Sequence, residues 1–388
     1  MRQFKRFTAI SMAILTILSN STFTYASNME NNSSLRYSID VINPITQTLS
    51  TDIEFLGSND YKTPDNLKNI GKISVNQDLV INDTAIALYP TFEDQSSALQ
   101  NISKTCQNIL TEFINTYQSK PLSDENYKTY QEFVNNYERS NLSQEMKNEL
   151  VTLDVFLDIY ENQFQNDEII ETAKSVSSIE KLLKDTDFNL LLPYTVSRAA
   201  FTTLANSINL PLDEPQTKAF TYNRSAAINY AKNHADSNNI NKSEYGYIEK
   251  ADCTNFASQI LEAGGMKRNT KWNFTKLPVI GFHYTDAWAN ANAFVNYFGV
   301  NQTFTKHSSF SSHVISGSFI TEDKANDSDW DHMGFVTDIS GYNSTLKFYD
   351  YQVAQHTSDY LAWASSSKCG WDTLPEDYPN IIYGIMNF

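Results

Sequence analysis

Cysteine is scarce in this sequence, which has three among 388 residues and neither a Cys-x-x-Cys nor a His-Glu-x-x-His spacing. The missing spacings exclude the common zinc motifs, and we expect neither a metal nor a cofactor. An odd number of cysteines leaves either a free thiol or an intermolecular pair. Either Cys106 and Cys369 form a disulfide and leave Cys253 free, or all three are free.

Basic residues are also few, with 29 Lys and Arg against 45 Asp and Glu, so the formal net charge is −16. This balance excludes nucleic acid and anionic membrane surfaces as expected partners. Only 12 glycines and 10 prolines are present, which excludes a low-complexity chain. Beyond the N-terminus no segment approaches the ~20 consecutive apolar residues of a membrane span.

The N-terminus has the pattern of an export signal. Three basic residues precede an apolar run over 7–18, and the small-residue segment 24–26 follows it. The run is too short to span a membrane, so the pattern predicts a signal peptide over 1–26, cleaved after Ala26. We therefore expect a secreted protein, extracellular or associated with the cell wall, without an integral membrane segment after cleavage.

The remaining chain changes its hydrophobic period twice. Period-two runs in 37–42, 72–75, 79–81 and 85–89 predict short strands, and apolar stripes at helical spacing follow. A polar stretch with Pro211 and Pro215 then suits a linker. The expected division is 27–92 short strands and loops, 93–205 a helical domain, 206–218 the linker and 219–388 a catalytic domain.

The stretch 249–265 predicts a helix that begins with a cysteine. Asp252 is a good N-cap, apolar residues recur at helical spacing, and Gly264 and Gly265 end the pattern. The unpaired N–H groups of a first helical turn favour a thiolate and can hold an oxyanion, as a cysteine nucleophile requires. The alternative for Cys253 is a small buried apolar side chain.

The resemblance to a known family lies in the second half of the chain. In order and spacing its motifs resemble the bacterial putative amidase domain, which is grouped with the papain-like cysteine hydrolases and with CHAP-type cell-wall hydrolases. The likeness covers about residues 220–388 and implies an α+β fold with the nucleophile helix packed on an antiparallel sheet, preceded here by a mainly helical domain. The motifs are 222–231, 252–259, 263–265, Trp272, 284–288, 331–332 and 354–357.

A cysteine nucleophile needs a base, and His332 is the strongest candidate. It opens the alternating run 332–338, and a histidine at the start of a core strand can be held rigidly between a thiol and an orienting group. The resemblance places the base at this position. His234, His307 and His313 lie in polar stretches that predict surface side chains.

The group that orients His332 is open to three candidates on the returning strand. If alternation holds after a turn at 341–344, Asp350 and His356 share one face and Gln355 lies on the other. The resemblance favours His356, through the motif 354–357, with Asp350 in reserve. Gln355 and His356 are alternatively structural residues that fix the hairpin.

The resemblance implies acyl transfer to water through a thioester, catalysed by Cys253, His332 and His356, with peptidoglycan or a peptide as substrate. One departure is Gly317-Ser318, where such domains usually have Gly-Asp. Two alternatives stand beside this function. One is a secreted protease or deamidase acting on proteins, and the other is a non-catalytic protein that binds the wall or a partner.

Overall fold

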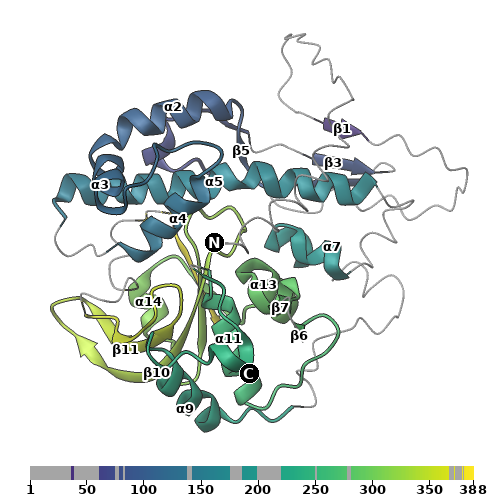
Figure 1. Cartoon of the computed structure of the whole chain (residues 1–388), viewed down its shortest axis with the longest axis vertical. Helices are drawn as coiled ribbons and strands as arrows, with labels where there is room; N and C mark the ends of the chain where they lie inside the picture. Colours follow the sequence, from purple (N-terminus) through teal and green to yellow (C-terminus); the bar gives the residue numbers. More distant parts are fainter. Residues whose placement is uncertain are drawn as a thin grey trace, which may run out of the picture. The chain divides into compact units, whose positions relative to one another are not determined.

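The structure is a computed structural model of the chain (Figure 1). The expected signal segment 1–26 and the expected linker 206–218 lie outside the residues that it describes, so both stay predictions. The described residues are 36–38, 61–74, 78–81, 84–137, 142–174, 186–198, 220–249, 251–277, 281–366, 371, 378 and 380–388.

Short strands come first, as the period-two runs predict. One three-stranded sheet has the order β1-β3-β4, with β1 and β3 parallel, and a second sheet pairs β2 with β5. The elements are β1 (Arg36–Ser38), η1 (Asp65–Leu67), β2 (Ile73–Ser74), β3 (Asp78–Ile81), β4 (Thr84–Ala87) and β5 (Thr91–Phe92).

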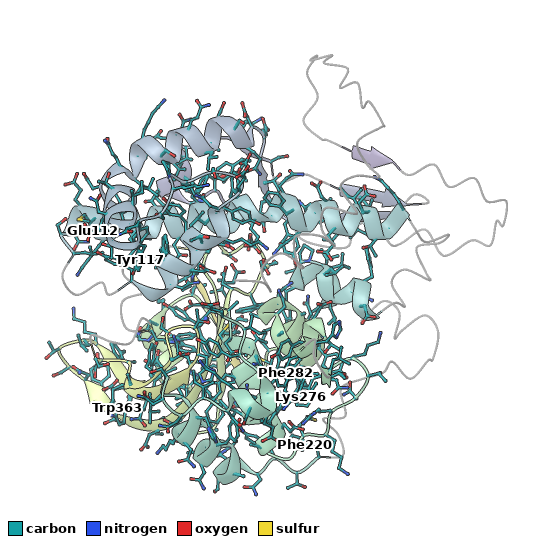
Figure 2. The ribbon with its side chains drawn as sticks, in the orientation of Figure 1. Glu112, Tyr117, Phe220, Lys276, Phe282 and Trp363 are labelled. Atoms are coloured by element: carbon teal, nitrogen blue, oxygen red, sulfur yellow. The ribbon has the colours of Figure 1, made fainter. Side chains whose placement is uncertain are left out.

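Helices follow where the apolar stripes predict them. The first apolar stripe, over residues 99–117, extends over two helices. The backbone leaves helical geometry at Cys106, where φ is −106° and ψ is 35°. Asp94 caps the first helix by accepting a hydrogen bond of 2.9 Å from the Ser97 N–H. Tyr117, at the end of the stripe, is 43% exposed (Figure 2). The helices are α2 (Gln95–Thr105), α3 (Gln107–Tyr117), α4 (Tyr127–Asn136), α5 (Gln144–Lys174) and α7 (Thr186–Leu191).

Helix α5 is the central element of this half. Every residue from Leu150 to Tyr160 is buried, so the helix is covered on all sides along this stretch. Its Phe156 belongs to the same continuous hydrophobic core as Val336 and Tyr383, which lie on strands of the C-terminal half. Residues Leu35–Phe388 accordingly form one compact unit.

The C-terminal half contains a six-stranded sheet whose neighbouring strands are all antiparallel, in the order β12-β11-β10-β9-β13-β8. The apolar run 333–336 of β10 is buried, whereas residues 338–342 are exposed. The strands are β8 (Gln302–Phe304), β9 (Phe319–Asp323), β10 (His332–Asn343), β11 (Phe348–Gln355), β12 (Tyr360–Trp363) and β13 (Ile382–Met386).

The helix that begins at Cys253 contacts this sheet at β10 and β11 (Figure 1). The mixed α+β class is thus confirmed. Residues 286–298 form two helices, because Asn290 is extended and its side chain caps the second helix at the Ala293 N–H. The remaining elements are α9 (Arg224–His234), α10 (Lys242–Tyr245), α11 (Cys253–Ala263), β6 (Phe274–Leu277), β7 (Gly281–Tyr284), α12 (Asp286–Ala289), α13 (Ala291–Phe298) and α14 (His307–Ser311).

None of the helices in the described part of the chain has the length and apolar character needed to cross a lipid bilayer.

Candidate active site

Cys253 is the first residue of α11, and its side chain is half-buried. Asp252 occupies the N-cap position as expected, but its side chain makes no capping bond to the helix. The carboxylate instead accepts hydrogen bonds of 2.7 Å from the Ile248 N–H and 2.7 Å from the Asn255 side chain. It thereby fixes the loop that leads into the helix. This side chain does not bind the first N–H groups of α11.

The residues that follow Cys253 in its motif hold α11 against two buried tryptophans. Asn255 accepts a hydrogen bond of 2.7 Å from the Trp288 Nε1–H. Ser258 accepts one of 2.9 Å from the Trp272 Nε1–H and donates one of 2.9 Å to the Trp288 carbonyl. All four side chains are fully buried, so these polar groups need partners. The motif is therefore explained by the packing of the helix as well as by the cysteine.

His332 is the first residue of β10, and its ring lies between Cys253 and Gln355. Its Nε2–H donates to the Gln355 Oε1 at 3.0 Å, which leaves Nδ1 for the hydrogen bond with the Cys253 thiol. Gln355 Oε1 is itself fixed, because it also accepts a hydrogen bond of 2.9 Å from the Trp371 Nε1–H. The glutamine oxygen only accepts hydrogen bonds, so it selects the neutral tautomer that carries its proton on Nε2. Nδ1 is then left to face the thiol.

The electrostatics of this pair favour a thiolate and an imidazolium. Burial raises the pKa of the Cys253 thiol. The charge of His332 and the hydrogen bond with it act in the opposite direction and together outweigh burial, so the pKa is lowered to about 7. Burial lowers the pKa of His332, but the neighbouring Cys253 and Glu322 raise it, to about 9. Between these two values the ion pair is the main form, and the thiolate is the nucleophilic species.

His356, the expected orienting residue, does not contact His332. The strand β11 ends at Gln355, and Thr357 has a left-handed backbone with φ of 86°, so the alternation of the strand does not extend to His356. Its fully buried ring stacks on Phe256 with centroids 3.7 Å apart. Nδ1 faces the Asp252 carboxylate at 2.6 Å, and Nε2 donates to the His234 carbonyl at 2.8 Å. The expectation for His356 is therefore corrected in favour of Gln355.

The reserve candidate, Asp350, is also directed away from His332. Its carboxylate accepts hydrogen bonds of 3.1 Å from the Ser365 N–H and 2.6 Å from the Ser365 hydroxyl. The turn before Asp350 was expected at 341–344. It occupies 344–347 instead, since β10 runs to Asn343. Asp350 thus fixes the turn that follows β12.

The structure describes three other residues that the sequence analysis names. His307 is 2% exposed, not on the surface, and its Nε2 lies 2.7 Å from the Tyr351 hydroxyl. Ser318, which stands where an acid was expected, is buried and donates to the Asn387 side chain at 2.8 Å. Cys106 is a free, buried thiol, and Cys369 lies outside the described residues.

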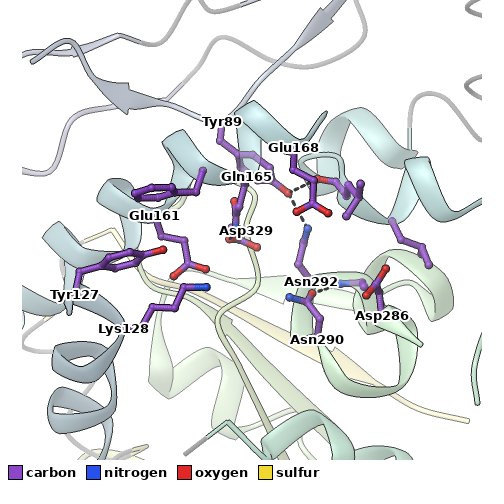
Figure 3. Close-up of a pocket in the computed structure, with 14 residues that line it drawn as sticks. Tyr89, Tyr127, Lys128, Glu161, Gln165, Glu168, Asp286, Asn290, Asn292 and Asp329 are labelled. Carbon is purple, nitrogen blue, oxygen red and sulfur yellow. Dashed lines mark hydrogen bonds between the residues drawn. The ribbon is translucent and has the colours of Figure 1, made fainter. Parts of the chain in front are cut away.

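The candidate pair lines a cleft of about 300 Å³ whose opposite wall comes from the helical half. That wall includes Lys128 and Gln131 of α4 and Asp158 and Glu161 of α5. A neighbouring pocket of about 250 Å³ shares five lining residues with the cleft (Figure 3). Nothing in the sequence marks these helices as part of the site, and Trp371 was missed for the same reason.

Across the ranges that the structure describes, no group of three or more His, Cys, Asp or Glu side chains is arranged to hold a metal ion. The acids beside the cleft are hydrogen-bonded to neighbouring groups instead. Asp327 accepts a bond of 2.6 Å from Asn162, and Asp329 accepts one of 2.7 Å from Gln165.

Comparisons with known proteins find a relative and a family model. An alignment of 147 residues is 34% identical to the uncharacterized protein YjcM of Bacillus subtilis (strain 168). It covers 38% of this chain and 28% of that relative. No solved structure matches. The family model described as "Putative amidase domain" matches residues 221–385, which include Cys253, His332 and Gln355, and this match supports the amidase domain family for that part of the chain.

Proposed function

We propose that the chain is a secreted cysteine-dependent amide hydrolase of the papain-like type, acting on peptidoglycan. The observation that carries the proposal is the arrangement Cys253, His332 and Gln355. A thiol at a helix start is paired with an imidazole whose far nitrogen is bound by a fixed amide oxygen. A cysteine that is only structural needs no such partner.

In the first half of the reaction the Cys253 thiolate attacks the amide carbonyl carbon and forms a C–S bond. The oxyanion develops beside the N–H groups of the first turn of α11. His332, as imidazolium, gives its Nδ1 proton to the leaving nitrogen, the C–N bond breaks, and the amine departs. A thioester remains on Cys253, and His332 is neutral.

In the second half a water molecule attacks the thioester carbonyl. His332 Nδ1 takes a proton from this water, the C–S bond breaks, and the thiolate of Cys253 is restored with the acid as product. Gln355 keeps the ring in one orientation through both halves, since its Oε1 accepts from Nε2–H in the neutral and the charged ring alike.

Export and wall substrate are supported by the sequence. The segment 1–26 has the pattern of a signal peptide, and the matched family resembles exported cell-wall hydrolases. The step from fold to substrate is an analogy.

The test is incubation of the purified full chain with peptidoglycan and chemical analysis of the released ends. A new amino group and a new free carboxylate are expected for each bond cleaved, and their position identifies the bond. Cys253→Ala should abolish release, whereas the matched variant Cys106→Ala, which alters a thiol outside the cleft, should retain it. Hydrolysis of a protein substrate without wall hydrolysis would favour the protease or deamidase. If a folded chain releases nothing from either substrate, the remaining candidate is the non-catalytic binding protein.

A further inference from the structure

The helical half supplies one wall of the cleft that contains Cys253. Residues of α4 and α5 lie outside the family match at 221–385, yet they line the cleft together with His332. Through the shared residues the cleft continues into the neighbouring pocket, where the stacked rings of Tyr127 and Phe164 lie with centroids 5.2 Å apart. A substrate bound at the thiol therefore meets side chains of both halves.

The cleft and its continuation are rich in acidic side chains. Eight carboxylate side chains and two lysine side chains line the cleft and its continuation. One of the lysines, Lys324, is already paired with Asp154 at 3.2 Å. Glu161 and Glu168, seven residues apart on one face of α5, form no ion pair with any residue that the structure describes. In Figure 3, Tyr127, Lys128 and Glu161 lie on one side of the pocket, and Asp286 lies on the other.

A second, independent observation is a set of buried polar atoms without hydrogen-bond partners among the described residues. They are Asp158 Oδ2, Trp330 Nε1 and Thr357 Oγ1, on side chains that line the cleft and are 7%, 4% and 9% exposed. Buried polar groups usually find partners, and unpaired ones mark a place for a ligand. A donor, an acceptor and a hydroxyl together fit a ligand that has both carbonyl and amino groups.

The acidic groups of the cleft also influence one another. Burial, followed by the charges of Asp327 and Asp331, raises the pKa of Asp329 well above its ordinary value. Burial and the charge of Asp331 raise the pKa of Asp158 in the same direction. The raised pKa values favour the neutral form of these two carboxyl groups, and a cationic ligand bound beside them would favour the charged form.

We propose that α4 and α5 form the recognition wall for the substrate and select an amide that carries a positively charged amino group. This inference rests on the proposed function, because it takes Cys253 as the reacting group. An ammonium group is cationic and donates three hydrogen bonds, so it complements a wall rich in carboxylates. A peptide with a free side-chain or terminal amine has this chemistry.

The test uses three thiol-directed probes that differ only in side chain: the chloroacetyl amides of lysine amide, norleucine amide and glutamate amide. The rate constant for labelling Cys253 is measured on the full chain by mass spectrometry. We expect the lysine probe to react roughly tenfold faster than the norleucine probe at low salt, the glutamate probe to react slowest, and the differences to shrink as salt rises.

Charge removal on the wall then identifies its source. Glu161→Gln combined with Glu168→Gln should lower the preference for lysine over norleucine roughly threefold or more. The matched control is Glu171→Gln on the same helix, which lines neither pocket and pairs with Lys174 in an exposed ion pair of 2.6 Å. This control should leave the preference unchanged. Equal labelling by the three probes, or an equal loss in both sets of variants, would overturn the inference.

The failure of the proposed function gives a different result. In that case no probe labels Cys253 faster than Cys106 or Cys369. The recognition wall is then tested by equilibrium binding of acetyl-lysine amide and acetyl-norleucine amide to the Cys253→Ala chain. Tighter binding of the lysine compound, lost in the Glu161→Gln and Glu168→Gln variant, supports the wall without the chemistry, and equal binding overturns it.

Discussion

The Asp252 carboxylate and the His356 imidazole lie 2.6 Å apart, between Oδ2 and Nδ1, and both side chains are fully buried. The other ring nitrogen of His356 faces the His234 carbonyl. Carboxylate and carbonyl oxygens only accept hydrogen bonds, so both ring nitrogens of His356 face acceptors. This buried pair holds Asp252, the residue that precedes Cys253, and it supports the nucleophile loop rather than the proton transfer.

The first prediction follows from that buried pair. His356→Ala should lower the free energy of unfolding by about 3–5 kcal/mol, because it leaves the buried Asp252 carboxylate without the ring that binds it. The control His313→Ala alters an exposed ring and should cost less than ~0.5 kcal/mol. Urea unfolding followed by circular dichroism measures both. Equal stability of the two variants would mean that the pair contributes nothing to the fold.

The second prediction concerns Gln355. His332→Ala should lower the rate of Cys253 acylation by p-nitrophenyl acetate by about 10²–10⁴-fold, and Gln355→Ala by at most about 10²-fold, since the base survives in a poorer orientation. Asp350→Ala, on the same strand, should leave the rate nearly unchanged, because its carboxylate binds Ser365. A large loss in Asp350→Ala with a silent Gln355→Ala would return the orienting role to the acid.

The third prediction is the pH profile of the thiol. The pKa of Cys253 is lowered to about 7, so the rate of its alkylation by iodoacetamide should rise with pH through a midpoint near 7. His332→Ala removes the positive charge that favours the thiolate, and the midpoint should move upward by more than one pH unit. Burial raises the pKa of Cys106, so that thiol should react slowly across the same range. A midpoint unchanged in His332→Ala would refute the ion pair.

The fourth prediction concerns Lys324, a buried lysine that lines the cleft. Its Nζ is buried with Asp154 at 3.2 Å and reaches Asn135 at 3.1 Å. Lys324→Met should destabilise the chain by about 3–5 kcal/mol, because buried carboxylates then lose their cation. The exposed pair Lys68 and Asp65 is the control, and Lys68→Met should cost at most ~1 kcal/mol. Denaturant unfolding of the two variants gives the comparison.

The sequence determined the features that depend on near neighbours along the chain. The helix that begins at Cys253 and the strand that opens at His332 follow from hydrophobic periods and end signals that a short window contains. The break between α2 and α3 at Cys106 leaves no mark on the apolar spacing, so the sequence does not predict it.

Only the tertiary structure decided which groups meet across the fold. Whether Gln355 or His356 faces His332 depends on where β11 ends and on the left-handed turn at Thr357, which alternation does not encode. The burial of His307 in a polar stretch and the place of α5 beside the thiol depend on packing between distant segments. Local patterns fix which face of an element is apolar, but the partner of that face is set by three-dimensional packing of the whole chain.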